Sequence, residues 1–219
     1  MTFSEENYLK SIYHLTASLE TEVSTNAIAE MMETKASSVT DMLKKLADKD
    51  LVNYKKYQGV SLTENGKLAA KMIVRKHRLW EVFLVEKLNF SWDEVHDIAE
   101  QLEHIRSNSL TEKLDKFLGF PKVDPHGDPI PDKTGKISEQ QNMPLSQLEE
   151  GEKAIMTGVA DHSTLFLRFL DKHEIHLGDS IETKETTAYD LSVQISVNRK
   201  KNFHISNEVA KNILVRKLK

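Results

Sequence analysis

Residues 37–63 decide the fold, and they read SSVTDMLKKLADKDLVNYKKYQGVSLT. In their first half, apolar side chains recur at the three- and four-residue spacing of an amphipathic helix, which we expect to open at Ser37-Ser38. Their second half contains two β-prone runs, 51–57 and 60–63, joined through Gly59, and this pattern is typical of a β-hairpin. The stretch therefore predicts a helix followed directly by a hairpin.

Two further helices are predicted upstream of this stretch. Tyr8 and Ile12 belong to an apolar face with helical spacing. A second helical run carries Ile28, and either Ser24 or Thr25 can cap its start. Three helices followed by a hairpin describe a winged helix-turn-helix.

Charge is segregated along the chain, although its 219 residues sum to a net charge of −4. Residues 35–78 hold 11 Lys and Arg against 4 Asp and Glu, whereas residues 79–130 hold 5 against 11. Hydroxyls near a helix N-terminus can approach base edges, and lysines further along can meet phosphates. We therefore predict that the winged helix binds double-stranded DNA, with a solvated helical bundle as the alternative. The candidate DNA-binding residues are Lys35, Ser37, Ser38, Thr40, Asp41, Lys44, Lys45, Lys55, Lys56 and Tyr57.

The rest of the chain divides into a helical and a β-rich part. A long helix is predicted over 63–88, and Ser91-Trp92-Asp93-Glu94 has the spacing of a capping box for the next helix. The stretch 120–144 contains all five prolines, so we expect a connector that lies outside the core. Beyond it, short strand-like runs interrupted by one helical run at 164–172 predict a small β-barrel.

Carboxylates and imidazoles gather on the two middle helices. Four of them lie at offsets of 0, +4, +7 and +8, which places them on one side of one helix; they are His96, Glu100, Glu103 and His104. His77 and Glu81 share a face of the preceding helix, and the connector adds Asp124-Pro125-His126. Helical bundles hold metals with such sets, and a set rich in oxygen donors favours manganese(II) or iron(II) over zinc. The alternative is that these are ordinary solvated helix faces.

The composition excludes several classes of protein. The absence of cysteine excludes disulfide scaffolds, thiol catalysis and cysteine-bound iron–sulfur clusters. No apolar stretch reaches the roughly 20 residues of a membrane span, and the acidic start is not a secretory signal, so we expect a cytoplasmic protein without a membrane partner. A metal-assisted hydrolase is disfavoured because the chain has no HExxH motif and only 8 glycines, so we predict that it is not an enzyme.

Taken together, the sequence resembles the diphtheria-toxin-repressor family of metal-dependent transcriptional repressors, and in particular its three-domain manganese-type branch. The motifs that carry the resemblance are spread over the whole chain. They are Tyr8–Tyr13, Ser37–Thr40, Arg75–Glu81, Val95–Asp97, Glu103-His104, Leu118–Pro121, Asp124–Gly127, Leu170–His173 and Leu177–Asp179.

The resemblance implies a mostly α fold with a small β domain. It implies a winged helix-turn-helix DNA-binding domain at 1–63, a helical dimerisation and metal-binding domain at 64–140, and an SH3-like (FeoA-like) β-barrel at 141–219. It also implies a homodimer that binds a palindromic operator, with Mn²⁺ or Fe²⁺ as co-repressor at two sites per subunit, and that controls genes of metal-ion homeostasis. The alternative is a metal-independent DNA-binding regulator whose SH3-like domain docks a peptide.

The ligands of both metal sites are likewise implied by the resemblance. The first site comprises Glu81, Asp124, His126 and Asp161, with His162 as a substitute for Asp161. The second comprises Asn7, His77, Glu100, Glu103 and His104, and His96 is a further candidate ligand. Asn7 stands where manganese-type members carry Asp. Because a neutral amide is a poorer ligand than a carboxylate, we expect the second site to be the weaker one.

Overall fold

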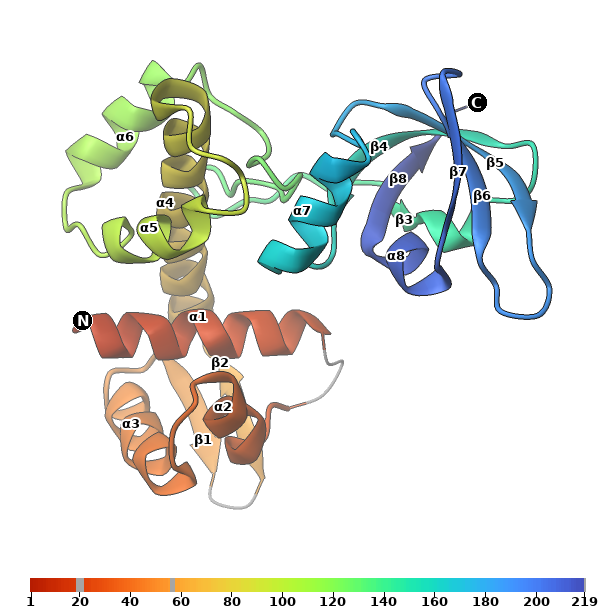
Figure 1. Cartoon of the computed structure of the whole chain (residues 1–219). Coiled ribbons are helices and arrows are strands. Elements are labelled where there is room, and N and C mark those ends of the chain that lie inside the picture. The colour runs from red at the N-terminus through yellow and green to blue at the C-terminus, as the bar shows by residue number, and fades with distance from the viewer. Residues whose placement is uncertain (19–21, 56–57, 219) are drawn as a thin grey trace. The chain divides into compact units, whose positions relative to one another are not determined.

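The computed structural model describes residues 1–18, 22–55 and 58–218 (Figure 1). The chain divides into two compact units. One unit consists of Met1–Trp80, Ala99–Lys116 and Ile130–Ile137. The other consists of Glu81–Ile98, Phe117–Pro129 and Ser138–Lys219.

The N-terminal part of the chain is a winged helix, as the sequence predicts (Figure 1). Its elements are α1 (Phe3–Ser18), α2 (Thr25–Met31), α3 (Ala36–Asp48), β1 (Val52–Lys55) and β2 (Gly59–Leu62). The two strands pair antiparallel from Val52↔Leu62 to Lys55↔Gly59. Ser24 caps α2 by accepting a hydrogen bond from the backbone N–H of Ala27. The expected start of the third helix is wrong by one residue, because α3 begins at Ala36 and Lys35 caps it without a side-chain hydrogen bond.

A single apolar core joins these elements. Leu9 of α1, Ile28 of α2, and Leu43 and Leu46 of α3 are fully buried in it together with Val60 of β2. The burial of each such side chain contributes about 1.5–3 kcal/mol to the stability of the folded state. Since one face of α3 is occupied in this core, its polar face is left outward.

Three helices follow the hairpin: α4 (Glu64–Leu88), α5 (Val95–Leu102) and α6 (Asn108–Phe117). Thr63 caps α4 because its Oγ1 accepts a hydrogen bond from the N–H of Gly66, 3.0 Å away. Before α5, the Glu94 carboxylate accepts a hydrogen bond from the N–H of Ser91, which is half of the predicted capping box. The expectation that Glu103 and His104 lie on the same helix as His96 and Glu100 is wrong: α5 ends at Leu102, and Glu103 and His104 are buried in the turn that follows.

The C-terminal part is a six-stranded antiparallel sheet with two helices (Figure 1). The strand order is β3-β8-β4-β5-β6-β7. The strands are β3 (Met143–Pro144), β4 (Lys153–Val159), β5 (Ser180–Thr186), β6 (Val193–Val197), β7 (Lys201–Ile205) and β8 (Ile213–Lys217), and the helices are α7 (Thr164–Lys172) and α8 (Asn207–Asn212), with a 3₁₀ turn at Leu145–Gln147. The helix predicted at 164–172 is confirmed with both of its ends, whereas β3, β7 and α8 are missed. No described helix is long and apolar enough to cross a membrane.

Candidate metal centre and DNA-binding face

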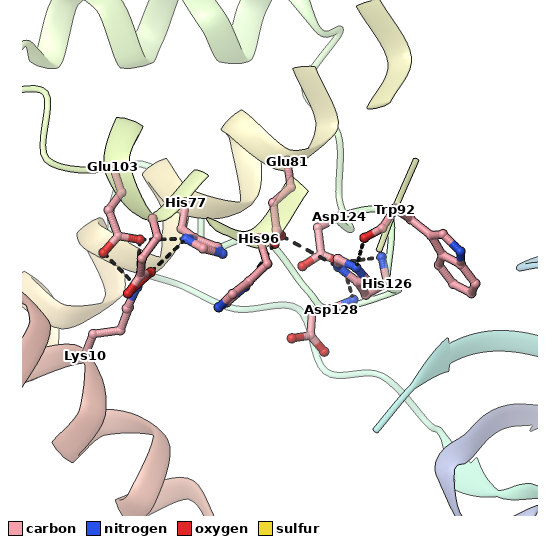
Figure 2. Close-up of polar contacts among 10 residues, drawn as sticks. Lys10, His77, Glu81, Trp92, His96, Glu103, Asp124, His126 and Asp128 are labelled. Carbon is pink, nitrogen blue, oxygen red and sulfur yellow. Dashed lines mark hydrogen bonds and ion pairs between the residues drawn. The ribbon is translucent and has the colours of Figure 1, made fainter. Parts of the chain in front are cut away.

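The second unit contains a buried group of two carboxylates and one imidazole (Figure 2). One oxygen of Glu81, one of Asp124 and one nitrogen of His126 lie within 4.8 Å of one another, and all three residues are at most 4% exposed. Glu81 is supplied by α4, and the other two by the connector that follows α6. The sequence-based grouping of these three residues is therefore matched by their positions in the fold.

His126 is held in the tautomer that a metal ligand requires. Its Nε2 lies 2.9 Å from the backbone oxygen of Trp92, and because a carbonyl only accepts, Nε2 must carry the proton. Its Nδ1 is buried without a hydrogen-bond partner, at 3.8 Å from Glu81 Oε2 and 3.9 Å from Asp124 Oδ1. Burial lowers the pKa of His126 below its usual value, despite the opposing attraction of Glu81, so the ring is neutral at pH 7.

The backbone around Asp124 is tightly fixed. Asp124 Oδ1 accepts hydrogen bonds from the N–H of His126 at 2.8 Å and of Asp128 at 3.0 Å, which closes a turn. Gly127 has a φ of +91°, and a Cβ there would stand 2.1 Å from the carbonyl oxygen of Thr157, so only glycine fits. The expectation that the connector lies outside the core is thus wrong at this point, because Asp124 and His126 are both buried.

This donor set fits a divalent cation. Two buried carboxylates and a neutral imidazole with a bare nitrogen lone pair are hard-to-borderline donors, of the kind that Mn²⁺ and Fe²⁺ accept. A buried nitrogen without a hydrogen-bond partner, such as His126 Nδ1, lowers the stability of the fold. A ligand bound to its lone pair would remove this cost.

Three further candidate ligands, His162, His96 and Asp161, differ in how they lie relative to this buried group. The ring of His162 stacks on that of His126, with centroids 4.8 Å apart. His96 Nδ1 lies 3.6 Å from Glu81 Oε1, with more than half of its side chain exposed. Asp161 does not belong to the buried group in the described part of the chain, and its Oδ1 accepts a hydrogen bond from the N–H of Ser163 at 2.8 Å. Of the two neighbours, His162 is therefore the one that the fold places against His126.

The first unit contains the second predicted cluster, around the fully buried carboxylate of Glu103 (Figure 2). His77 Nδ1 lies 2.6 Å from Glu103 Oε2. His104 Nδ1 instead lies 2.6 Å from Glu6 Oε2. Asn7 Oδ1 is buried without a partner. Burial raises the pKa of the Glu103 carboxyl, but the hydrogen bond from His77 and the nearby ammonium group of Lys10 outweigh it and hold that pKa below its usual value.

Sequence reasoning missed two members of this cluster. The Lys10 ammonium group donates to both oxygens of Glu103, at 2.7 and 2.8 Å, and to the carboxylate of Glu100. Glu6 accepts from His104. A signal was present for Lys10, because it lies three residues after Asn7 and therefore on the same face of α1.

The predicted DNA-binding residues are mostly exposed on and beside α3. Thr40 is half-buried, and its hydroxyl donates to the backbone oxygen of Ala36 within the helix. Lys44 Nζ lies 3.3 Å from Asp41 Oδ1 in a weak exposed pair. Lys56 and Tyr57 lie outside the described residues. The exposed members are Lys35, Ser37, Ser38, Asp41, Lys44, Lys45 and Lys55.

Together these features define a winged-helix protein with a buried group of two carboxylates and one imidazole. Three families match successive parts of the chain: "Iron dependent repressor, N-terminal DNA binding domain" over residues 1–60, "Iron dependent repressor, metal binding and dimerisation domain" over 63–132, and "FeoA domain" over 143–217. The chain therefore belongs to the iron-dependent repressor family of metal-dependent transcriptional repressors.

Individual relatives agree with this assignment. An uncharacterized HTH-type transcriptional regulator of Methanocaldococcus jannaschii is 37% identical over 118 residues, which are 54% of this chain and 94% of the relative. The iron-dependent repressor IdeR of Mycobacterium tuberculosis is 33% identical over 58% of this chain, and the match spans only 54% of IdeR. A solved manganese-dependent transcriptional repressor in complex with manganese is 32% identical, with a TM-score of 0.87, 98% of this chain covered and 100% of that one. Relatives of this chain are thus named for iron as well as for manganese.

Proposed function

We propose that this protein is a cytoplasmic metal sensor that represses genes of metal-ion homeostasis by binding a palindromic operator as a homodimer. The activating ion is Mn²⁺, with Fe²⁺ as the alternative, and it binds at Glu81, Asp124 and His126. The observation that carries the proposal is the buried, unpartnered Nδ1 of His126, which faces both carboxylates. His162 or Asp161 completes the site.

The residues of this site connect the metal to DNA through α4. A bound divalent ion supplies the positive charge that holds the two carboxylates close together. Glu81 belongs to α4, whereas Asp124 and His126 belong to the connector, so neutralising their charges fixes α4 relative to the connector. The residue before α4, Thr63, donates a hydrogen bond from its hydroxyl to the backbone oxygen of Asp50 in the winged helix. Because α4 is joined to the winged helix in this way, fixing α4 limits the orientations of the winged helix. Of those orientations, it favours the one in which the two α3 helices of a dimer reach successive major grooves.

Operator binding measured against metal concentration tests the proposal. An operator is first selected from a random duplex library with the full chain and Mn²⁺, and binding to it is then titrated with Mn²⁺ and, without oxygen, with Fe²⁺. We expect the affinity for the operator to rise with metal and to fall when a chelator is added. Binding that a chelator leaves unchanged would indicate the metal-independent regulator instead.

Replacing Lys44 and Lys45 together by alanine should weaken binding to every DNA sequence. Each lost phosphate contact should lower the slope of log K against log salt by about 0.9, so the double variant should lose about 2 units of slope. The measurement is fluorescence anisotropy at several salt concentrations. A matched variant that replaces the exposed Lys200 and Lys211 of the FeoA domain should keep the slope of the wild type. An unchanged slope in the Lys44/Lys45 variant would refute the placement of α3 on DNA.

The protein should be a dimer at micromolar concentration even without metal. The matched dimerisation domain contains α5 and α6, and on α6 the apolar Leu110 and Phe117 are 37% and 64% exposed. Covering such side chains favours association. Sedimentation equilibrium of the metal-free chain should give about twice 25.0 kDa. A stable metal-free monomer would contradict this prediction.

A further inference from the structure

The carboxylate cluster of the first unit already contains a cation of its own (Figure 2). Lys10 Nζ lies 2.7 Å from Glu103 Oε1 and 2.8 Å from Glu103 Oε2, and it also donates to Glu100. The side chain of Lys10 is only 11% exposed, and that of Glu103 is 0% exposed. The ammonium group therefore contacts three carboxylate oxygens, two of them on a fully buried side chain and the third on Glu100, whose side chain is 35% exposed.

The donors that remain in this cluster do not fit a second divalent ion while Lys10 is present. A metal bound by Glu103 would need the oxygens to which Lys10 donates, and two cations that share those oxygens repel each other. His104 binds Glu6 through Nδ1, and its Nε2 lies 4.0 Å from Glu103 Oε1, the same oxygen to which Lys10 donates. Asn7 brings an oxygen but no charge to offset a further cation.

We propose that the ammonium group of Lys10 is the resident cation of this cluster, so that each chain holds one tightly bound divalent ion rather than two. Lys10 lies on α1 of the winged helix, and Glu100 and Glu103 lie in and just after α5. Their hydrogen bonds thus connect the DNA-binding part to the middle helices without a metal. This inference deepens the proposed function, on which it rests for the single metal site at Glu81, Asp124 and His126.

Counting bound metal tests the inference directly. Equilibrium dialysis of the full chain against Mn²⁺, followed by elemental analysis, should give one tightly bound ion for the wild type. Lys10→Met removes the ammonium group and keeps most of the side-chain volume, which leaves Glu100, Glu103 and His77 with the unpartnered Oδ1 of Asn7. The count should therefore rise to two. Adding Asn7→Asp to Lys10→Met should tighten the second ion further, whereas Asn7→Asp alone should leave the count at one.

Two variants control for charge and for the general loss of an ion pair. Lys10→Arg keeps a cation in the cluster, and its count should stay at one. Lys49→Met removes a lysine that also pairs with α1, at 2.7 Å from Glu5 Oε1, but outside the cluster, and it should also keep a count of one. Two tight ions in the wild type, or the same count in Lys10→Met as in the wild type, would overturn the inference. A third outcome separates the two proposals. If the wild type bound no ion tightly and Lys10→Met bound one, Lys10 would be confirmed as the resident cation, and the proposed metal site at Glu81, Asp124 and His126 would be refuted.

A measurement on the wild type alone covers the case in which Lys10→Met does not fold. Reductive methylation mapped by mass spectrometry should modify Lys49, which is 47% exposed, much faster than Lys10. Saturating Mn²⁺ should leave Lys10 equally protected. If metal exposed Lys10 to methylation, the ion would have displaced the ammonium group, and Lys10 would not be the resident cation.

Discussion

Replacing Asp124 by asparagine should lower the affinity for Mn²⁺ by at least about 100-fold, because removing even an outer partner of a metal ligand costs about 10–100-fold. The substitution removes the negative charge of one of the three buried donors. The amide oxygen of asparagine can still accept the hydrogen bonds from the N–H groups of His126 and Asp128. The turn should therefore persist, and the metal concentration needed for operator binding should rise by the same factor.

Asparagine is the informative replacement because alanine would remove the metal donor and the turn together. The connector offers a matched control in Asp132, whose Oδ1 accepts hydrogen bonds from the N–H of Thr134 at 2.7 Å and of Lys136 at 3.0 Å. Asp132→Asn changes the same chemistry in the same kind of turn, at a residue that is not one of the three donors. Calorimetric titration should show wild-type affinity for Asp132→Asn and the loss for Asp124→Asn. Equal affinities in all three proteins would show that Asp124 is not a ligand.

The winged helix could be predicted from sequence because its elements are local. Alternating and helical periodicities over 37–63, and the cap at Ser24, are set by neighbours within a few residues. The helix at 164–172 is equally local, since Ser163 caps it and its apolar face repeats regularly. By contrast, β7 over 201–205 alternates weakly because three of its five residues are exposed at the sheet edge.

The candidate sites were only partly predictable, because they depend on contacts between distant segments. The grouping of Glu81 with Asp124 and His126 came from a family resemblance, and spacing alone could not have placed a connector residue against α4. Lys10 was missed because its partners Glu100 and Glu103 lie 90 and 93 residues away. The burial of Asp124 was missed because prolines predict an irregular backbone and carry no information on whether that backbone is covered.

Replacing Arg75 by methionine should lower the free energy of unfolding by about 3–5 kcal/mol, the usual cost of breaking a buried ion pair. Arg75 of α4 is 4% exposed, and its guanidinium donates to Asp115 Oδ2 at 2.7 Å and to the backbone oxygen of Pro131 at 2.9 Å. Methionine fills the space but leaves the Asp115 carboxylate and the Pro131 carbonyl buried without this donor. The loss should appear as a lower midpoint of urea unfolding.

A double variant separates the effect of the lost ion pair on stability from the effect of changed packing. Adding Asp115→Leu to Arg75→Met removes the stranded carboxylate, and a buried pair replaced by apolar side chains is often no less stable than the original. The double variant should therefore recover a large part of the loss. Lys67→Met provides the control on the same helix: Lys67 pairs with Glu64 at 2.8 Å, but both side chains are exposed, so its effect should stay below about 1 kcal/mol. If Arg75→Met unfolded at the same urea concentration as Lys67→Met, the buried pair would not stabilise α4 against α6 and the connector.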